Sequence, residues 1–271
     1  MKESQLIELI DGALELADQA SQKVLEIYNS ADLKFESKKD GSPVTEADIA
    51  SHQILNKGLC KLDNKIPVLS EEGNVNFMPD ENLFWLIDPL DGTKEFINRN
   101  GEFTVNIALV EMGSPILGIV FSPAVDENFF GSINLGAFKV SGTERERILP
   151  RKQAEDKCSV ALSKSHKSKD DEWFVNQCKK RFNVVHELPT GSSLKLCKVA
   201  EGKADIYSRL GPTYQWDIAA GQAVVEAAGG IVNDLHGNPL TYKFNSKIKN
   251  PHFFCAGDKN FPWLELFREL N

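Results

Sequence analysis

The chain has 271 residues, with 31 Lys and Arg against 39 Asp and Glu, so its formal net charge is −8. Apolar residues make up 41% and charged residues 26%. This balance excludes a disordered chain and predicts a globular protein of about two domain-sized units. The acidic charge argues against a nucleic-acid binder, which needs a basic face, but it leaves room for a small anionic ligand.

Neither a membrane span nor a site of soft metal ligands is expected. The longest uncharged run, residues 112–125, contains Gly113, Pro115 and Gly118, so it is too short and too interrupted to span a bilayer. Charges among the apolar residues of the N-terminal segment are unlike a signal peptide, and we expect a cytoplasmic protein. The five cysteines and five histidines are scattered, which predicts neither a disulfide framework nor a zinc site.

The first half of the chain predicts two helices followed by a run of strands. Apolar residues at three- and four-residue steps predict an amphipathic helix over residues 4–29. A turn at Asp40-Gly41 and an extended segment lead to a second helix from Thr45 to about Leu59. Strands are predicted over residues 66–69, 83–87, 103–110, 116–121, 129–133 and 138–140.

The second half alternates between strands and helices after a polar stretch, residues 141–157, which we interpret as the boundary between residues 1–145 and 146–271. Strands are predicted over residues 159–162, 184–188, 204–207 and 231–233, and helices over 170–181, 192–201 and 216–228. This alternation is typical of strands covered by helices. The sequence therefore predicts a mixed α/β protein of stacked sheets and helices.

Two aspartates, Asp88 and Asp91, follow a strand predicted to be buried and precede a helix that begins near Thr93. Pro89 keeps Asp88 out of helical conformation, and Gly92 lets a ligand approach the backbone. The N–H groups at the start of a helix favour a bound anion. Two carboxylates beside that anion would repel it unless a cation lay between them. The pair predicts a metal–phosphate site. Taken singly, Asp91 as a turn residue and Asp88 as a helix cap are equally good interpretations.

Further acidic residues stand at the starts or ends of predicted elements. Glu71 and Glu72 follow a short strand, where a surface charge pair is the alternative. Asp217 lies in the first turn of a helix, and Asp48 stands three residues after Thr45, at capping-box spacing. If these carboxylates share one pocket, hard divalent cations must neutralise them. Since only oxygen ligands are available, Mg²⁺ is the expected ion.

Four motifs occur in register over about residues 4–257: Asp40-Gly41-Ser42-Pro43-Val44-Thr45 with Asp48, Ser70-Glu71-Glu72, Asp88-Pro89-Leu90-Asp91-Gly92-Thr93, and Trp216-Asp217-Ile218-Ala219-Ala220-Gly221. They resemble the motifs of the magnesium-dependent, lithium-sensitive phosphatase superfamily of inositol monophosphatase and fructose bisphosphatase. Residues 92–97, 100–109, 163–166 and 191–195 are similar to its 3′(2′),5′-bisphosphate nucleotidases of the CysQ type. The resemblance implies an αβαβα layered sandwich.

The resemblance also implies the roles of the acidic residues. Glu71, Asp88 and the carbonyl of Leu90 would hold one Mg²⁺, while Asp88, Asp91 and Asp217 would hold a second, and a third ion is an open alternative. Thr93, paired with Asp48, would orient and deprotonate the attacking water, with Glu71 nearby.

The substrate would meet a second group of residues. Its phosphate would lie on the N–H groups of Gly92 and Thr93, and Glu71, Leu90, Asp91 and Asp217 would meet it through the ions. The nucleotide would contact His166, Ser192, Lys195 and Arg209. As single residues, these four are explained equally well as a surface histidine, a helix cap and two solvated cations.

The implied reaction is hydrolysis of the 3′-phosphate of adenosine 3′,5′-bisphosphate, or of its sulfated precursor, in the nucleotide recycling of sulfur assimilation. A phosphatase for inositol monophosphate or a sugar bisphosphate is an alternative. Lys94 and Glu95 argue against it, because inositol monophosphatases typically have Thr and Asn at these two positions. A non-catalytic Mg²⁺ or phosphate sensor is another, but it should have lost Thr93, Asp48 or a ligand. We expect a small nucleotide partner, no nucleic-acid polymer and at most peripheral attachment to the cytoplasmic face of the inner membrane. A homodimer is left open.

Overall fold

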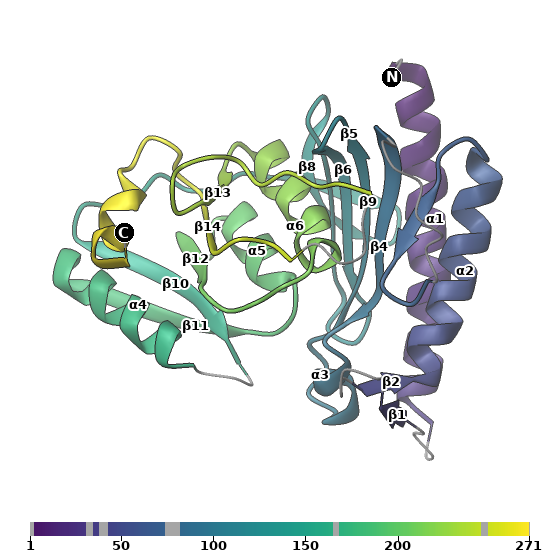
Figure 1. Cartoon of the computed structure of the whole chain (residues 1–271), viewed down its shortest axis with the longest axis horizontal. Helices are drawn as coiled ribbons and strands as arrows, with labels where there is room; N and C mark the ends of the chain where they lie inside the picture. The colour runs from purple at the N-terminus through teal and green to yellow at the C-terminus, as the bar shows by residue number, and fades with distance from the viewer. Residues whose placement is uncertain are drawn as a thin grey trace.

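The computed structural model describes residues 3–30, 35–37, 43–73, 82–164, 168–244 and 249–270. Five layers follow one another across the molecule in the order α, β, α, β, α (Figure 1). The predicted αβαβα sandwich is therefore confirmed. The upstream motif residues Asp40, Gly41 and Ser42, and His166, lie outside the described residues.

The first layer consists of α1 (Glu3–Tyr28) and α2 (Glu46–Leu62), which cover one face of the larger sheet (Figure 1). The face of α1 that carries Leu6, Leu9, Ala13 and Ala17 is buried, as its three- and four-residue spacing predicts. The start of α2 is fixed by a capping box between Thr45 and Asp48. Both predicted helices are thus confirmed.

The second layer is a seven-stranded sheet in the order β3-β4-β5-β6-β7-β8-β9. Its strands are β3 (Val68–Ser70), β4 (Leu83–Asp91), β5 (Thr104–Glu111), β6 (Ser114–Ser122), β7 (Glu127–Ser132), β8 (Gly136–Ser141) and β9 (Glu144–Ile148). Only β3 and β4 pair in parallel, and the other neighbours are antiparallel. A separate two-stranded sheet joins β1 (Phe35–Ser37) to β2 (Pro43–Thr45), and the short α3 (Thr93–Ile97) follows β4.

The remaining layers come from the second half of the chain. Between the sheets lie α5 (Leu194–Ala200) and α6 (Gln215–Ala228). The second sheet has the order β11-β10-β12-β14-β13, with strands β10 (Lys157–Ser163), β11 (Val184–Thr190), β12 (Ile206–Arg209), β13 (Ile231–Asp234) and β14 (Phe253–Ala256). On its far face lie α4 (Lys169–Arg181) and a 3-10 helix (Trp263–Leu270) (Figure 1).

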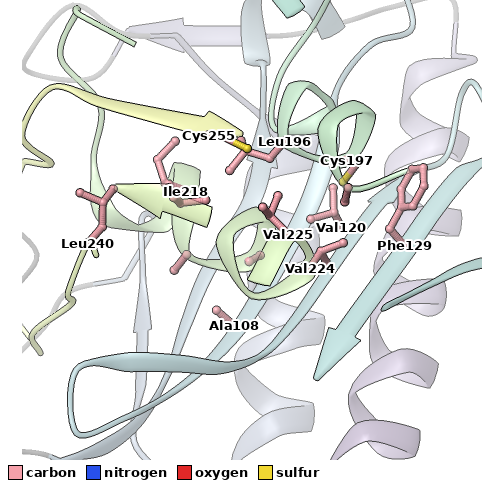
Figure 2. Close-up of a cluster of buried hydrophobic side chains, with 14 of the residues drawn as sticks. Ala108, Val120, Phe129, Leu196, Cys197, Ile218, Val224, Val225, Leu240 and Cys255 are labelled. Carbon is pink, nitrogen blue, oxygen red and sulfur yellow. The ribbon is translucent and has the colours of Figure 1, made fainter. Parts of the chain in front are cut away.

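The central core packs α5 and α6 between the two sheets. Figure 2 shows Val120 and Phe129 of the first sheet, Leu196 of α5, Val224 of α6 and Cys255 of the second sheet in one cluster. This packing holds α6, and with it the first turn of α6, against the first sheet.

Three differences from the predicted elements have physical reasons. The stretch 141–157 contains β9, an edge strand whose exposed residues are charged, so its sequence resembles a linker. The apolar run of β14 is buried on both faces and shows no period. Finally, β4 continues through Pro89 to Asp91 instead of ending at Ile87. No helix among the described residues is long and apolar enough to cross a membrane.

Candidate active site

A β-bulge in β4 brings Asp88 and Asp91 to the same face of the first sheet. Asp88 pairs with Asn106 of β5 and Asp91 pairs with Thr104, so β4 has one residue more than its partner over this interval. Residues three apart in a regular strand point to opposite faces, and the extra residue reverses this. The Leu90 side chain accordingly packs on the α1 and α2 side. Both carboxylates therefore lie on the side of α5 and α6.

The bulge is tied to α2 by two side chains. Ser51 Oγ donates a hydrogen bond to the carbonyl of Pro89 at 2.7 Å. Thr93 Oγ1, at the start of α3, donates to Asp48 Oδ1 at 3.2 Å, while Asp48 Oδ2 accepts from the Thr45 N–H at 2.7 Å. Asp48 therefore caps α2 and also holds Thr93, so its structural role and its predicted pairing occur together.

Glu71 and Asp217 approach from two other elements. Because β3 runs parallel to β4 with Ser70 opposite Ile87, Glu71 comes level with Asp88, and the Glu71 N–H donates to the Ile87 carbonyl at 3.2 Å. Asp217 lies in the first turn of α6, where its Oδ2 accepts from the Tyr214 N–H at 2.9 Å. Four carboxylates from distant parts of the sequence are thus directed into one region.

The carboxylates act on one another electrostatically. Burial and the negative charges of Glu71, Asp91 and Asp217 raise the pKa of Asp88 well above its ordinary value. Burial and the charge of Asp91 likewise raise the pKa of Asp217. For Asp91, burial raises the pKa in spite of the Ser192 hydrogen bond and the charge of Lys195. The positive charges of Lys195 and Arg209 therefore do not outweigh the burial and mutual repulsion of these acids.

The donor set fits a hard divalent cation. It offers carboxylate and carbonyl oxygens only, and the buried negative charges repel one another. No three His, Cys, Asp or Glu side chains of the described residues already lie in the arrangement of a metal cage. Instead, Asp88 accepts from the Leu90 N–H at 3.0 Å and Asp91 Oδ2 from the Ser193 N–H at 2.8 Å. The residues that could hold an ion are therefore in the right region, with backbone donors on their oxygens.

A cleft with a volume of about 500 Å³ opens beside this region, between the two sheets. Its lining includes six residues of the predicted site: Asp91, Gly92, Ser192, Lys195, Arg209 and Asp217. Asp48, Glu71, Asp88 and Thr93 do not line it. Of the predicted nucleotide contacts, those within the described residues (Ser192, Lys195 and Arg209) thus lie next to two of the acids.

Two of the cations that line the cleft, Lys195 and Arg209, are held by backbone carbonyls. Lys195 Nζ donates to the Ser192 carbonyl at 2.6 Å and lies 5.6 Å from the centre of the Tyr207 ring. Burial lowers the pKa of Lys195, although the charge of Asp91 favours its ammonium form. Arg209 donates to the Pro212 carbonyl at 3.3 Å, and its buried Nε has no hydrogen-bond partner among the described residues. Neither cation forms an ion pair with another described residue.

Comparison with protein-family models adds a decisive observation, since residues 5–255 match the model described as the inositol monophosphatase family. The chain belongs to this family. A protein of Escherichia coli O157:H7 named 3′(2′),5′-bisphosphate nucleotidase CysQ is 42% identical over 248 residues, which cover 90% of this chain and 98% of the relative.

Two solved structures of inositol monophosphatase family members are also similar to this chain. CysQ from Bacteroides thetaiotaomicron is 37% identical with a TM-score of 0.77, and the match covers 92% of this chain and 96% of the other. An inositol monophosphatase from Anabaena is 26% identical with a TM-score of 0.75, covering 98% and 96%. The family generally depends on Mg²⁺.

Three residues of this family member's site carried no predicted role: Glu102, Thr104 and Asn106, which contact the segment 191–193. A signal for two of them exists in the sequence. Thr104 and Asn106 are polar at alternate positions of β5, whose other residues up to Val110 are apolar and buried. Polar residues with a period of two in a strand covered on both faces indicate a polar partner on one face.

Proposed function

We propose that the protein is a Mg²⁺-dependent phosphoric monoester hydrolase that removes the 3′-phosphate of adenosine 3′,5′-bisphosphate, or of its sulfated form. One observation carries the proposal. The same cleft is lined by the acids Asp91 and Asp217 and by the cations Lys195 and Arg209. A substrate with two separate phosphates fits this division, because one phosphate can meet the ions and the other the cations. The relatives named 3′(2′),5′-bisphosphate nucleotidase support it.

The cations suit the part of the substrate that does not react. Within the described part of the chain, the buried Nε of Arg209 has no partner, so a ligand oxygen there would satisfy a donor that is otherwise costly to bury. Lys195 is buried and near Asp91, which places a positive charge beside the acids. Ser192 stands between the two groups, since its hydroxyl donates to Asp91. We place His166 among these contacts on the family resemblance alone.

Glu71, Asp88, Asp91, Asp217 and the Leu90 carbonyl would hold the metal ions. When bound, Mg²⁺ supplies positive charge that acidifies water and stabilises the negative charge developing on the phosphate ester. The chain itself supplies orientation. The Gly92 backbone has φ 88° and ψ 43°, a left-handed conformation that turns the chain from β4 into α3. The N–H groups of Gly92 and Thr93 then provide donors for phosphate oxygens.

Thr93 and Asp48 would handle the proton of the attacking water. Because Thr93 Oγ1 donates its hydrogen to Asp48 Oδ1, the lone pairs of the hydroxyl are left to accept a hydrogen bond from water. A proton taken from that water can pass through the hydroxyl to Asp48. Asp48 is 2% exposed, and its second oxygen is already bonded to Thr45, so it is held in position to receive the proton.

Phosphate release from a panel of esters tests the function. The panel contains adenosine 3′,5′-bisphosphate, its sulfated form, inositol 1-phosphate and fructose 1,6-bisphosphate, each with Mg²⁺ and with EDTA. We expect kcat/KM to be highest for one of the two nucleotides and turnover to disappear with EDTA. Preference for inositol phosphate or the sugar would favour the phosphatase alternative. Mg²⁺ binding without turnover of any ester would favour the sensor.

The number of ions and the assembly state are finer proposals. We propose two Mg²⁺ ions, with three as the alternative, no nucleic-acid polymer as partner, and a homodimer. The ion number is tested by Mn²⁺ binding counted by electron paramagnetic resonance, and the dimer by sedimentation velocity.

A further inference from the structure

Every second residue from Glu102 to Asn106 bonds to the turn that precedes α5. We call Glu102, Thr104 and Asn106 the polar ladder. Glu102 Oε2 accepts the N–H of Gly191 at 2.6 Å. The Thr104 hydroxyl lies 2.7 Å from that of Ser192 and 2.8 Å from that of Ser193, and Ser193 Oγ donates to Asn106 Oδ1 at 2.8 Å. Three successive turn residues are thus bonded in order to three alternate ladder residues.

The turn over residues 191–193 needs this support. Ser192 has φ 51°, a left-handed conformation that is costly for a residue with a side chain and persists only where its surroundings enforce it. Gly191 packs directly on Glu102, because a Cβ on Gly191 would lie 2.6 Å from the Cβ and the carbonyl oxygen of Glu102. The ladder therefore fixes both the conformation of the turn and its distance from β5.

The position of the turn decides where the cleft residues stand. The carbonyl of Ser192 accepts from Lys195 Nζ at 2.6 Å, so Lys195 follows any movement of the turn. The Ser193 N–H donates to Asp91 Oδ2 at 2.8 Å, which joins the same turn to the acid cluster. Displacement of the turn would change the distance between the cation and the acids.

Glu102 also has a counter-ion. Its Oε1 lies 2.8 Å from Lys164 Nζ, at the end of β10. The Lys164 side chain is 44% exposed and that of Glu102 is 18% exposed. The pair reduces the repulsion that Glu102 would exert on an anionic substrate, but a partly exposed ion pair contributes little to holding the turn. The hydrogen bond to the Gly191 N–H is the contact that acts on the turn.

We propose that Glu102 and Thr104 are positioning residues that set the affinity for the bisphosphorylated nucleotide. By holding the turn over residues 191–193, they fix the position of Lys195 relative to the acid cluster. Lys195 can then bind one phosphate of the substrate while the other phosphate lies at the acids. Neither Glu102 nor Thr104 is among the residues that line the cleft. This inference rests on the proposed function and adds to it the residues that select the substrate.

Thr104→Val and Thr104→Ser form a matched pair of variants. Valine keeps the volume of Thr104 and removes its hydroxyl, whereas serine keeps the hydroxyl. We expect Thr104→Val to raise KM for adenosine 3′,5′-bisphosphate about tenfold or more, with kcat and the Mg²⁺ concentration for half-maximal rate within about threefold of wild type. Thr104→Ser should restore KM. A parallel loss of kcat and Mg²⁺ response would mean that the ladder serves the ions, which would overturn the proposal.

Glu102→Gln and Lys164→Gln separate the two contacts of Glu102 and do not depend on the folding of Thr104→Val. Glutamine at position 102 weakens the bond to the Gly191 N–H, so KM should rise about threefold to tenfold. Lys164→Gln removes only the ion pair and should change KM less than threefold. An equal rise in both variants would assign the effect to the ion pair and overturn the proposal. Wild-type protein that turns over other esters but not the bisphosphate would refute the function first and this inference with it.

Discussion

Thr93 Oγ1 lies 3.2 Å from Asp48 Oδ1, and this hydrogen bond joins the start of α3 to the start of α2 across 45 residues. The other oxygen of Asp48 accepts the Thr45 N–H and hydroxyl at 2.7 and 2.6 Å. A carboxylate held on both sides can keep a hydroxyl oriented without moving itself. The same contact therefore supports the fold and the proposed chemistry.

Replacement of Thr93 by Val should lower kcat about a hundredfold or more, because the hydroxyl that would orient water and pass on its proton is lost. KM should stay near wild type, and the thermal midpoint should fall only slightly, because Thr93→Val removes the hydrogen bond to Asp48 Oδ1 but leaves the capping box between Thr45 and Asp48 intact. Steady-state kinetics and circular dichroism melting measure the two effects. Thr93→Ser is the control and should keep most of the activity. If Thr93→Val stays within tenfold of wild type, Thr93 does not handle the proton.

Asp91→Asn should lower kcat about a thousandfold or more, because metal ions contribute several kcal/mol of transition-state stabilisation and each 1.4 kcal/mol is about a factor of ten. Without Mg²⁺, its thermal midpoint should equal or exceed that of wild type. The variant removes repulsion on Asp88 and Asp217, and its amide oxygen can still accept from the Ser193 N–H.

Asp170→Asn is the matched control for this variant, because Asp170 lines the same cleft but lies exposed on α4, outside the acid cluster. Its kcat should stay within about threefold of wild type. Full activity in Asp91→Asn, or an equal loss in both variants, would contradict the assignment of Asp91 as a metal ligand. Thermal melts with and without Mg²⁺ complete the comparison.

Local patterns in the sequence predict much of the fold. Helices α1, α2 and α6 follow from apolar spacing and capping residues, since these depend on neighbours within a few positions. Strands β9 and β14 are not predicted from the sequence. Strand β9 is charged and lies at an exposed edge, and β14 is buried on both faces and so shows no alternation. Their identity as strands depends on where the rest of the chain places them.

The site shows the same division between local and distant information. The spacing of Asp88 and Asp91 points to a shared role, but whether they share a face depends on a bulge that only the pairing with β5 defines. The polar ladder is even harder to predict from the sequence, because Glu102 and Gly191 are 89 residues apart and come into contact only once both halves are folded. Motif spacing indicates which residues act. It does not indicate which residues hold them.

Gly118→Ala tests how closely α6 must approach the first sheet. A Cβ on Gly118 of β6 would lie 2.0 Å from the carbonyl oxygen of Ala220 and 2.8 Å from the Cβ of Ala223, so the α6 backbone must move. We expect a loss of about 3 kcal/mol in the free energy of unfolding. Activity should fall as well, because α6 carries Asp217. Urea unfolding and phosphate release measure the two.

Gly12→Ala provides the control for Gly118→Ala. Its new Cβ would also be close to a neighbour, at 2.5 Å from Leu62, but it meets the end of a flexible and partly exposed side chain. Alanine is also favoured over glycine in a helix by about 1 kcal/mol, so the net change should be small. An equal loss of stability in both variants would contradict the prediction that the close approach of α6 to β6 requires glycine at position 118.

Glu127 of β7 ties the first sheet to α5 and should make stability depend on pH. Its Oε1 lies 2.6 Å from Lys198 Nζ, with Lys139 and Lys203 at 3.7 and 3.8 Å. Burial alone would raise the pKa of Glu127, but the hydrogen bond and charge of Lys198, together with the two other lysines, hold this pKa below its ordinary value. A carboxyl with a lowered folded-state pKa stabilises the protein above its unfolded-state pKa, and this contribution is lost as pH falls through the folded-state value.

Glu127→Gln should therefore be about 1 kcal/mol less stable than wild type at pH 7, a modest loss because the cluster is partly exposed. The difference should shrink as the pH falls through the lowered pKa of Glu127, where the wild type loses the same contribution by protonation. Urea unfolding followed by tryptophan fluorescence at several pH values from 7 to 3 measures it. Glu144→Gln, on the exposed edge strand β9, should match wild type throughout. A Glu127→Gln deficit that is independent of pH would show that Glu127 stabilises the sheet by packing, because loss of packing does not follow the protonation of a carboxyl.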